Sequence, residues 1–178
     1  MTAINRLSGI TTDSEGRMLF GPGILEADFG EGYVNLGVCH GEAVFDPQAE
    51  IADPDYSGKP GKTKGHRYIT MRTPLLTVGM MEWDEVNINL AAQASSGAPH
   101  PYILPDEAYI DKIKYTAPLG DGATQAVEIE LLNCLTDGEL ELIMTAEEGR
   151  MQTSFTPHYA KDDVTFATAP WTAKVISL

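Results

Sequence analysis

Residues 125–144 read QAVEIELLNCLTDGELELIM, and this stretch decides the fold class. Apolar residues at 127, 129 and 131 alternate with Glu128 and Glu130, and those at 140, 142 and 144 alternate with Glu139 and Glu141. A period of two is typical of strands with one buried and one solvated face. The dipeptide Asp-Gly at 137–138 is a strong hairpin signal, because both central residues of the favoured turn need positive φ. The stretch therefore predicts an antiparallel hairpin between residues 125–135 and 139–145.

Similar patterns predict strands along the rest of the chain, at 25–29, 33–38, 43–46, 68–73, 75–83, 109–115, 151–156, 164–168 and 173–178. Many short strands with few helices favour an antiparallel β-sandwich or barrel over an α/β fold. One flanking α-helix is predicted at 85–94, where Asp84 can cap the first turn and Val86, Leu90 and Ala94 share one face.

Length, charge and cysteine content limit the class of protein. The chain has 178 residues, which suits one domain over 1–178 with a buried core. No apolar segment resembles a membrane span or a signal peptide, so we expect no membrane contact. Cys39 and Cys134 are expected to be buried free thiols. A net charge of −14 argues against a basic nucleic-acid-binding surface. It is consistent with solubility alone, and equally with a conduit that lets DNA pass without binding it.

A long polar loop is predicted at about 47–66. Its Gly61-Lys62-Thr63 resembles part of a phosphate-binding loop, but Tyr56 stands where such a loop has glycine and a strand-like run follows, so we reject nucleotide binding. What remains is a basic segment on an acidic protein, formed by Lys59, Lys62, Lys64 and Arg67. It is predicted to pair with another copy of the chain, and a solvated loop is the alternative.

The remaining polar residues do not form a catalytic or metal-binding pattern. The four histidines are scattered, and Cys39-His40 has no second cluster at metal-ligand spacing. Adjacent carboxylates such as Asp162-Asp163 point in opposite directions in an extended chain. We therefore expect no cofactor, no metal and no enzymatic activity.

The order of these features resembles the major tail tube proteins of siphophages, the long-tailed bacteriophages. The resemblance covers nearly the whole chain and is carried by five segments: 21–24, 36–45, 58–65 with 68–69, 75–78 before the helix, and 155–159 followed by 162–163.

The resemblance implies a β-sandwich with a flanking helix, six copies in each ring, and rings stacked into a tube that conducts DNA during infection. It implies the tape measure and terminator proteins as partners, and a place in the virion after synthesis in the host cytoplasm. In such a tube Glu128, Glu130, Glu139 and Glu141 are candidate lumen-lining residues. The basic segment is a candidate contact to the next subunit or ring.

Other classes remain open from the sequence. A tube protein of a contractile injection system could share this fold and charge, and a head-tail connector or tail terminator would form a ring that does not polymerise. A carbohydrate-binding β-sandwich would need exposed aromatic residues on one face. Trp83 and Trp171 lie in apolar surroundings, and we interpret them as core or interface residues.

Overall fold

Antiparallel strand pairing organises the part of the chain that the computed structural model describes, namely residues 22–39, 43–53, 67–82, 85, 87–88, 106–119, 124–136, 141–144, 149–163 and 168–178. These residues contain nine strands and one 3-10 turn, η2 (Asp106–Ala108). The strands are β1 (Ile24–Asp28), β2 (Tyr33–Val38), β3 (Val44–Ala52), β4 (Tyr68–Met80), β5 (Ile110–Leu119), β6 (Gln125–Thr136), β7 (Glu141–Met144), β8 (Gly149–Pro157) and β9 (Trp171–Ser177). The predicted mainly β, antiparallel fold class is confirmed.

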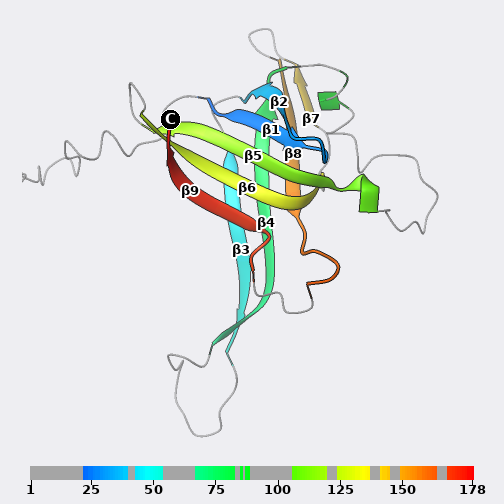
Figure 1. Cartoon of the computed structure of the whole chain (residues 1–178), viewed down its shortest axis with the longest axis vertical. Helices are drawn as coiled ribbons and strands as arrows, with labels where there is room; N and C mark the ends of the chain where they lie inside the picture. Colours follow the sequence, from blue (N-terminus) through cyan, green and yellow to red (C-terminus); the bar gives the residue numbers. More distant parts are fainter. Residues whose placement is uncertain are drawn as a thin grey trace, which may run out of the picture.

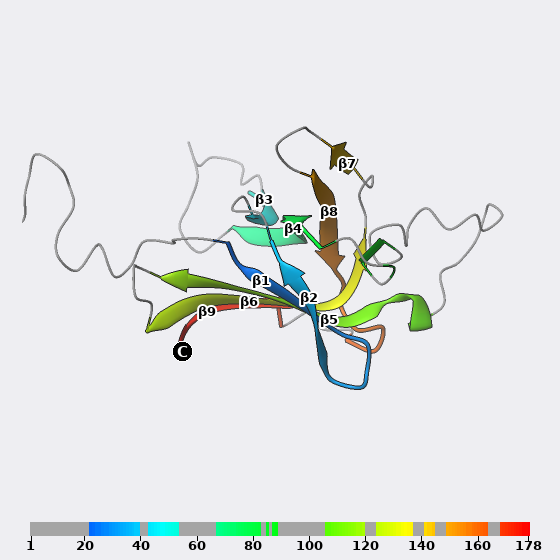
Figure 2. The same cartoon turned by 90° about the horizontal axis from the view of Figure 1, so that it is seen from above.

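The strands form one sheet that folds into two layers. Its order is β2-β1-β5-β6-β8-β4-β3, with β9 paired to β6 and β7 paired to β8. In Figures 1 and 2, β1, β5, β6 and β9 cross over β3, β4 and β8. Cys39, which follows β2 at one end of the sheet, also forms an isolated bridge with Met80 of β4 in the other layer. On the open side the rings of Phe45 and Trp171 pack edge to face, with centroids 5.0 Å apart.

Strand β6 joins the two layers by changing partners along its length. Residues 125–131 pair with β9, whereas 134–136 pair with β8. Between them Asn133 has a φ of 49°, a conformation that asparagine adopts more readily than most residues. Two hydrogen bonds hold the backbone where β6 changes partners. Asn133 Nδ2 donates to the carbonyl oxygen of His158 (3.2 Å), and the backbone N–H of His158 donates to the carbonyl oxygen of Asn133 (3.2 Å).

The core lies between the layers and is built from the alternating apolar positions that define the strands. Its fully buried large side chains are Leu25, Leu76, Val78, Met80, Ile110, Ile113, Leu131, Met151 and Phe155. Trp171 packs against this cluster as a partly buried residue, in line with its interpretation as core. Trp83 lies outside the described residues.

Three expectations about the elements need revision or remain open. The predicted hairpin between 125–135 and 139–145 is wrong, because β7 pairs with β8 and both edges of β6 are occupied by β5, β9 and β8. The flanking helix is not confirmed: of 85–94 only Glu85, Asn87 and Ile88 are described, and their backbone is helical. The strand expected at 164–168 lies almost entirely outside the described residues.

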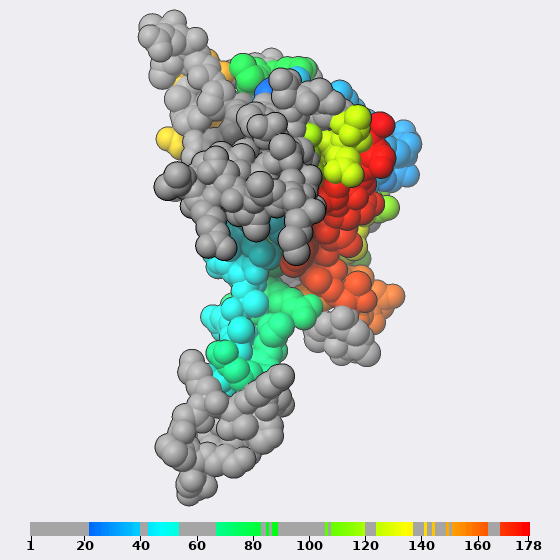
Figure 3. All heavy atoms as spheres, turned by 90° about the vertical axis from the view of Figure 1, so that its left-hand side faces the viewer, coloured from blue at the N-terminus to red at the C-terminus, as the bar shows by residue number. Residues whose placement is uncertain are grey.

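The hairpin of β3 and β4 projects from the two layers as an arm. We define the arm as residues 46–53 and 67–75; the first part of the loop expected at 47–66 therefore belongs to β3, and 54–66 lie outside the described residues. Figure 3 shows the arm extending away from the rest of the molecule. The pairing of β3 with β4 is continuous from Val44 and Thr77 to Ala52 and Tyr68, apart from a bulge after Glu50.

Gly23 gives a first test of the packing. A methyl group at this position would overlap the ring of Tyr115, which is 7% exposed. We expect Gly23→Ala to lower the free energy of unfolding by about 1–3 kcal/mol, as overpacking commonly does, and urea denaturation measures it. In a Tyr115→Leu background the ring is gone and the same substitution should cost less. An equal cost in both backgrounds would contradict the packing argument.

Candidate assembly surfaces

The arm exposes large apolar side chains. Ile51, Tyr68, Ile69 and Met71 are 47–56% exposed, and they lie on paired positions of β3 and β4. The arm is held in shape by the strand pairing and by two further contacts. Thr70 Oγ1 donates to the carbonyl oxygen of Glu50 (3.2 Å), and Arg67 Nε donates to Asp53 Oδ1 (2.6 Å). Ile51 and Ile69 are register partners on one face of the hairpin, whereas Tyr68 and Met71 are the partners of Ala52 and Glu50 on the other face. Apolar side chains exposed on a projecting element are typical of a protein–protein contact.

The basic segment predicted to contact another copy is only partly described. Arg67 lies immediately before β4 on the arm, where it forms an ion pair with Asp53 and its side chain is 43% exposed. Lys59, Lys62 and Lys64 lie outside the described residues. The charges therefore drew attention to this part of the sequence, and the apolar side chains were missed, although Ile51 lies within the predicted loop and Tyr68 and Ile69 follow it.

Glu128 and Glu130, two of the candidate lumen-lining residues, share the outward face of β6. Both carboxylates have a partner within the subunit, and that of Glu128 is an ion pair. Lys174 Nζ of β9 lies 2.8 Å from Glu128 Oε1, since the two residues are register partners. The hydroxyl of Tyr33 donates to Glu130 Oε2 (2.9 Å). Glu130 is also the register partner of Lys114 in β5.

Lys114 and Tyr33 link four strands across this outward face. Lys114 Nζ forms an ion pair with Glu26 Oε2 of β1 (2.6 Å) and lies 4.0 Å from the ring centroid of Tyr33 in β2. The face therefore alternates carboxylates with lysines and is less acidic than the sequence predicted. Sequence reasoning missed Tyr33, Lys114 and Lys174, because their role depends on which strands are neighbours.

Of the other two acidic candidates, only Glu141 is described, and it is not part of this face. Glu141 is exposed on β7, which pairs with β8. Glu139 lies outside the described residues. The three described carboxylates that the sequence grouped in one lining are thus divided between β6 and β7.

Tyr33 gives a pH-dependent test of this outward face. Burial, together with the hydrogen bond to Glu130, raises the pKa of the Tyr33 phenol above its ordinary value. The stability that the phenol contributes is then fully present below about pH 10 and is lost as the pH rises through the folded pKa.

Tyr33→Phe removes that contribution. We expect a cost below about 1 kcal/mol at neutral pH, since the side chain is 38% exposed. The advantage of the wild type over Tyr33→Phe should shrink above about pH 10. Urea unfolding of both proteins at neutral and alkaline pH measures the difference, and a difference that does not change with pH would contradict the assignment.

The two thiols offer no reactive group. Cys39 and Cys134 are free and buried, as predicted. Burial raises the pKa of each thiol to about 12, so the thiolate that reacts with oxidants or metals is not formed at neutral pH. Within the described residues no group of three or more His, Cys, Asp or Glu side chains is placed to hold a metal ion. No helix of the described residues is long and apolar enough to cross a membrane.

Together the fold and these surfaces define a mainly β, antiparallel protein with an exposed arm. Two solved structures of Hcp proteins are similar to it. One is the Hcp1 protein of E. coli EAEC 042, with a TM-score of 0.40 and 15% identity, covering 88% of this chain and 97% of that one. The other is described as Hcp protein, with a TM-score of 0.41 and 11% identity, covering 89% and 100% of the two chains. No protein-family model matches the chain, and no curated protein does. Similarity at this level assigns neither a family nor a function.

Proposed function

We propose that this chain is a structural subunit that joins copies of itself into closed rings, which stack into a hollow tube. The observation that carries the proposal is the arm. A two-stranded hairpin that leaves Ile51, Tyr68, Ile69 and Met71 about half exposed gains little from that apolar surface in a monomer. A second copy that covers it would gain the hydrophobic stabilisation.

The contact within a ring is supplied by β2 and β9, the outer strands of the layer that also contains β1, β5 and β6. Among the described residues β9 pairs only with β6, and β2 pairs only with β1 apart from the bridge at Cys39. Unpaired edges of this kind favour addition of another strand. An edge-to-edge contact that repeats by rotation closes a ring. A second contact along the axis, made by the arm, then continues the stack.

The tail tube of a long-tailed phage is the first specific form of the proposal. It would give six copies in each ring, tape measure and terminator proteins as partners, a place in the virion, and DNA passing through the lumen without specific binding. The net charge of −14 supports passage of DNA.

A tube protein of a contractile injection system is the second candidate function, and one observation favours it. The outward face of β6 pairs Glu128 with Lys174 and Glu130 with Tyr33. Because Lys174 offsets the charge of Glu128, this face repels DNA less than a bare acidic lining would. If that face lines the lumen, the cargo need not be DNA.

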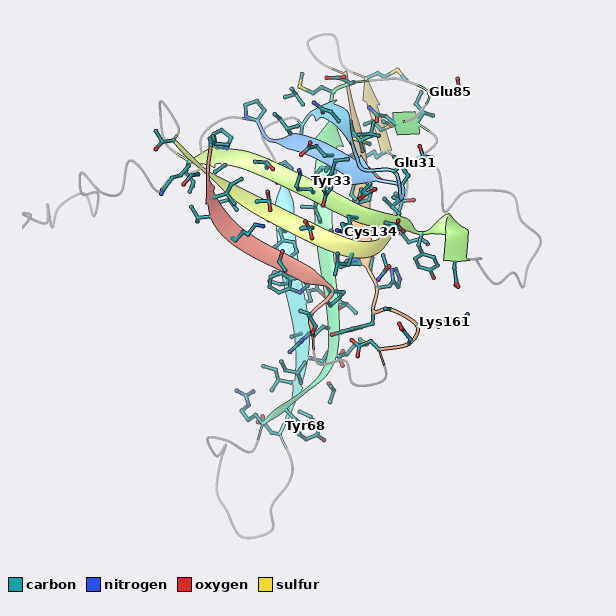
Figure 4. The ribbon with its side chains drawn as sticks, in the orientation of Figure 1. Glu31, Tyr33, Tyr68, Glu85, Cys134 and Lys161 are labelled. Carbon is teal, nitrogen blue, oxygen red and sulfur yellow. The ribbon has the colours of Figure 1, made fainter. Side chains whose placement is uncertain are left out.

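A carbohydrate-binding module receives less support. Tyr33 is engaged with Glu130 and Lys114 on the outward face, whereas Tyr68 lies on the arm (Figure 4). Tyr33 and Tyr68 therefore do not belong to one aromatic platform. We propose that the protein acts by assembly and without catalysis.

Negative-stain electron microscopy of the purified protein across a concentration and salt series tests the proposal. We expect hollow rings and, at higher concentration, stacked tubes. A chain that stays monomeric under every condition, alone and when seeded with preformed tail complexes, would overturn the proposal. Glycan-array binding would then be the next measurement.

A further inference from the structure

Within the described residues, backbone pairing joins the two layers at two places, and each place contains one of the two cysteines. The first is the β6–β8 link, where residues 134–136 are opposite 155–157. The second is the β2–β4 link, where Cys39 forms its bridge with Met80. Figure 4 shows Cys134 where β6 passes over to the second layer. Both thiols are fully buried, so each becomes accessible only when its own link opens.

The β2–β4 link is reinforced by a buried amide. Asn87 is fully buried, and its Nδ2 donates to the carbonyl oxygens of Leu36 (2.9 Å) and Glu82 (3.0 Å). Leu36 belongs to β2 and Glu82 follows β4, so one side chain ties the two layers together. The backbone N–H of Met81 donates to the carbonyl oxygen of Val38 (3.3 Å) across the same link. These hydrogen bonds resist separation of the layers at the β2–β4 link.

The β6–β8 link contains two features that weaken it. One of its three residue pairs includes Pro157, which has no N–H group to donate to the ladder. Beside the link the core contains the hydroxyl groups of Thr136 and Thr153, which are 0% and 2% exposed and have no hydrogen-bond partner among the described residues. Thr136 is opposite Phe155, and Thr153 stands two positions before Phe155 in β8. All three side chains therefore share the core face.

The two hydroxyl groups lower the free energy needed to open the β6–β8 link. A buried hydroxyl without a partner has lost its hydrogen bonds to water and gained none in return, so it destabilises the closed form. Separation of residues 134–136 from β8 lets water reach both groups and recovers that loss. The opening stops at Asn133, whose hydrogen bonds with His158 hold β6 where it changes partners. It is therefore local, and the pairing of β6 with β5 and β9 is kept.

We infer that the two layers separate locally at the β6–β8 link, because its buried hydroxyls lack partners, while the β2–β4 link holds the layers together. The inference does not depend on the proposed function, since it concerns the single subunit. Opening exposes Cys134 and frees the edge of β8 at residues 155–157, whereas Cys39 stays buried. The open form thus presents a free strand edge, which the closed form does not.

Thiol labelling of the wild-type protein is the first test, because both cysteines are followed in the same molecule. The protein is treated with N-ethylmaleimide under native conditions, and peptide mass spectrometry measures the modification of each cysteine over time. We expect Cys134 to react at least about tenfold faster than Cys39, since Cys39 becomes accessible only when the whole chain unfolds. A smaller difference, or faster reaction of Cys39, would overturn the inference.

Thr136→Val and Thr153→Val, combined in one protein, test the role of the hydroxyls. Valine keeps the shape of threonine and replaces the hydroxyl by a methyl group, so we expect Cys134 to react at least about tenfold more slowly than in the wild type. Thr77→Val is the matched control, because it makes the same exchange on the other face of β4 and β8, where Thr77 Oγ1 lies 2.8 Å from Ser154 Oγ. It should not slow the reaction. Unchanged labelling of the double variant, or equal slowing by the control, would overturn the inference.

Discussion

Replacing Phe155 with alanine is expected to lower the free energy of unfolding by about 3–5 kcal/mol, a large share of the stability of an ordinary domain. Phe155 is fully buried, and its register partners are Leu76 in β4 and Thr136 in β6. The ring thus lies where β6 passes from one layer to the other. Strands hold the surrounding side chains in place, so the cavity left by the substitution cannot collapse easily. Urea denaturation followed by tryptophan fluorescence measures the loss.

Phe29→Ala is the control for this prediction, because it removes the same group from a side chain that is 48% exposed in the turn after β1. We expect a cost below about 1 kcal/mol. If both substitutions cost the same, the stability of the fold does not depend on the packing of Phe155 where β6 passes between the layers.

The positions of most strands could be predicted because the period-two pattern is local. Residues 33–38 were predicted as a strand and form β2, and 125–135 fall within β6. The break predicted near Pro74 is absent, since β4 runs through it. β4 can continue through Pro74 because this residue is opposite Pro47 in β3. Neither proline has an N–H group, so no donor is left without an acceptor between them at that position.

The pairing of strands could not be predicted, because it depends on competition between edges. The Asp-Gly turn signal at 137–138 concerns only the residues around it. In the structure β6 gives one edge to β5 and the other to β9 and β8, and none remains for β7. The same limit explains the missed lysines. Lys114 and Lys174 become partners of carboxylates only through the order β1-β5-β6-β9, which no local pattern specifies.

The sequence predicted a loop with a basic contact segment at about 47–66, and it did not predict the hairpin that forms the arm. The basic residues between 59 and 67 mark this segment, because they stand out in a chain with a net charge of −14. The sequence alone does not show that Ile51 and Ile69 are register partners, because this depends on how β3 pairs with β4. Charge alone predicts a contact that salt weakens, whereas apolar side chains predict one that survives screening. Assembly that persists at high salt would support the apolar contact.

Replacing Ile69 with glutamate is expected to abolish stacking at concentrations where the wild type forms tubes, while the free energy of unfolding changes by less than about 0.5 kcal/mol. Ile69 is 47% exposed on the arm, so a carboxylate there is solvated in the free subunit. Docking of the arm would bury it without a partner, at a cost of several kcal/mol, and each copy in the tube would bear that cost. Sedimentation velocity and electron microscopy measure assembly, and circular dichroism measures folding.

Thr73→Glu is the control, because it adds the same charge to an exposed polar position of the same strand. We expect this variant to form tubes, since no apolar contact is lost. If both variants fail to stack, negative charge on the arm is sufficient to block assembly and the apolar side chains are not its cause. If Ile69→Glu stacks as readily as the wild type, the arm is not an axial contact, and the apolar surface that carries the proposed function needs another partner.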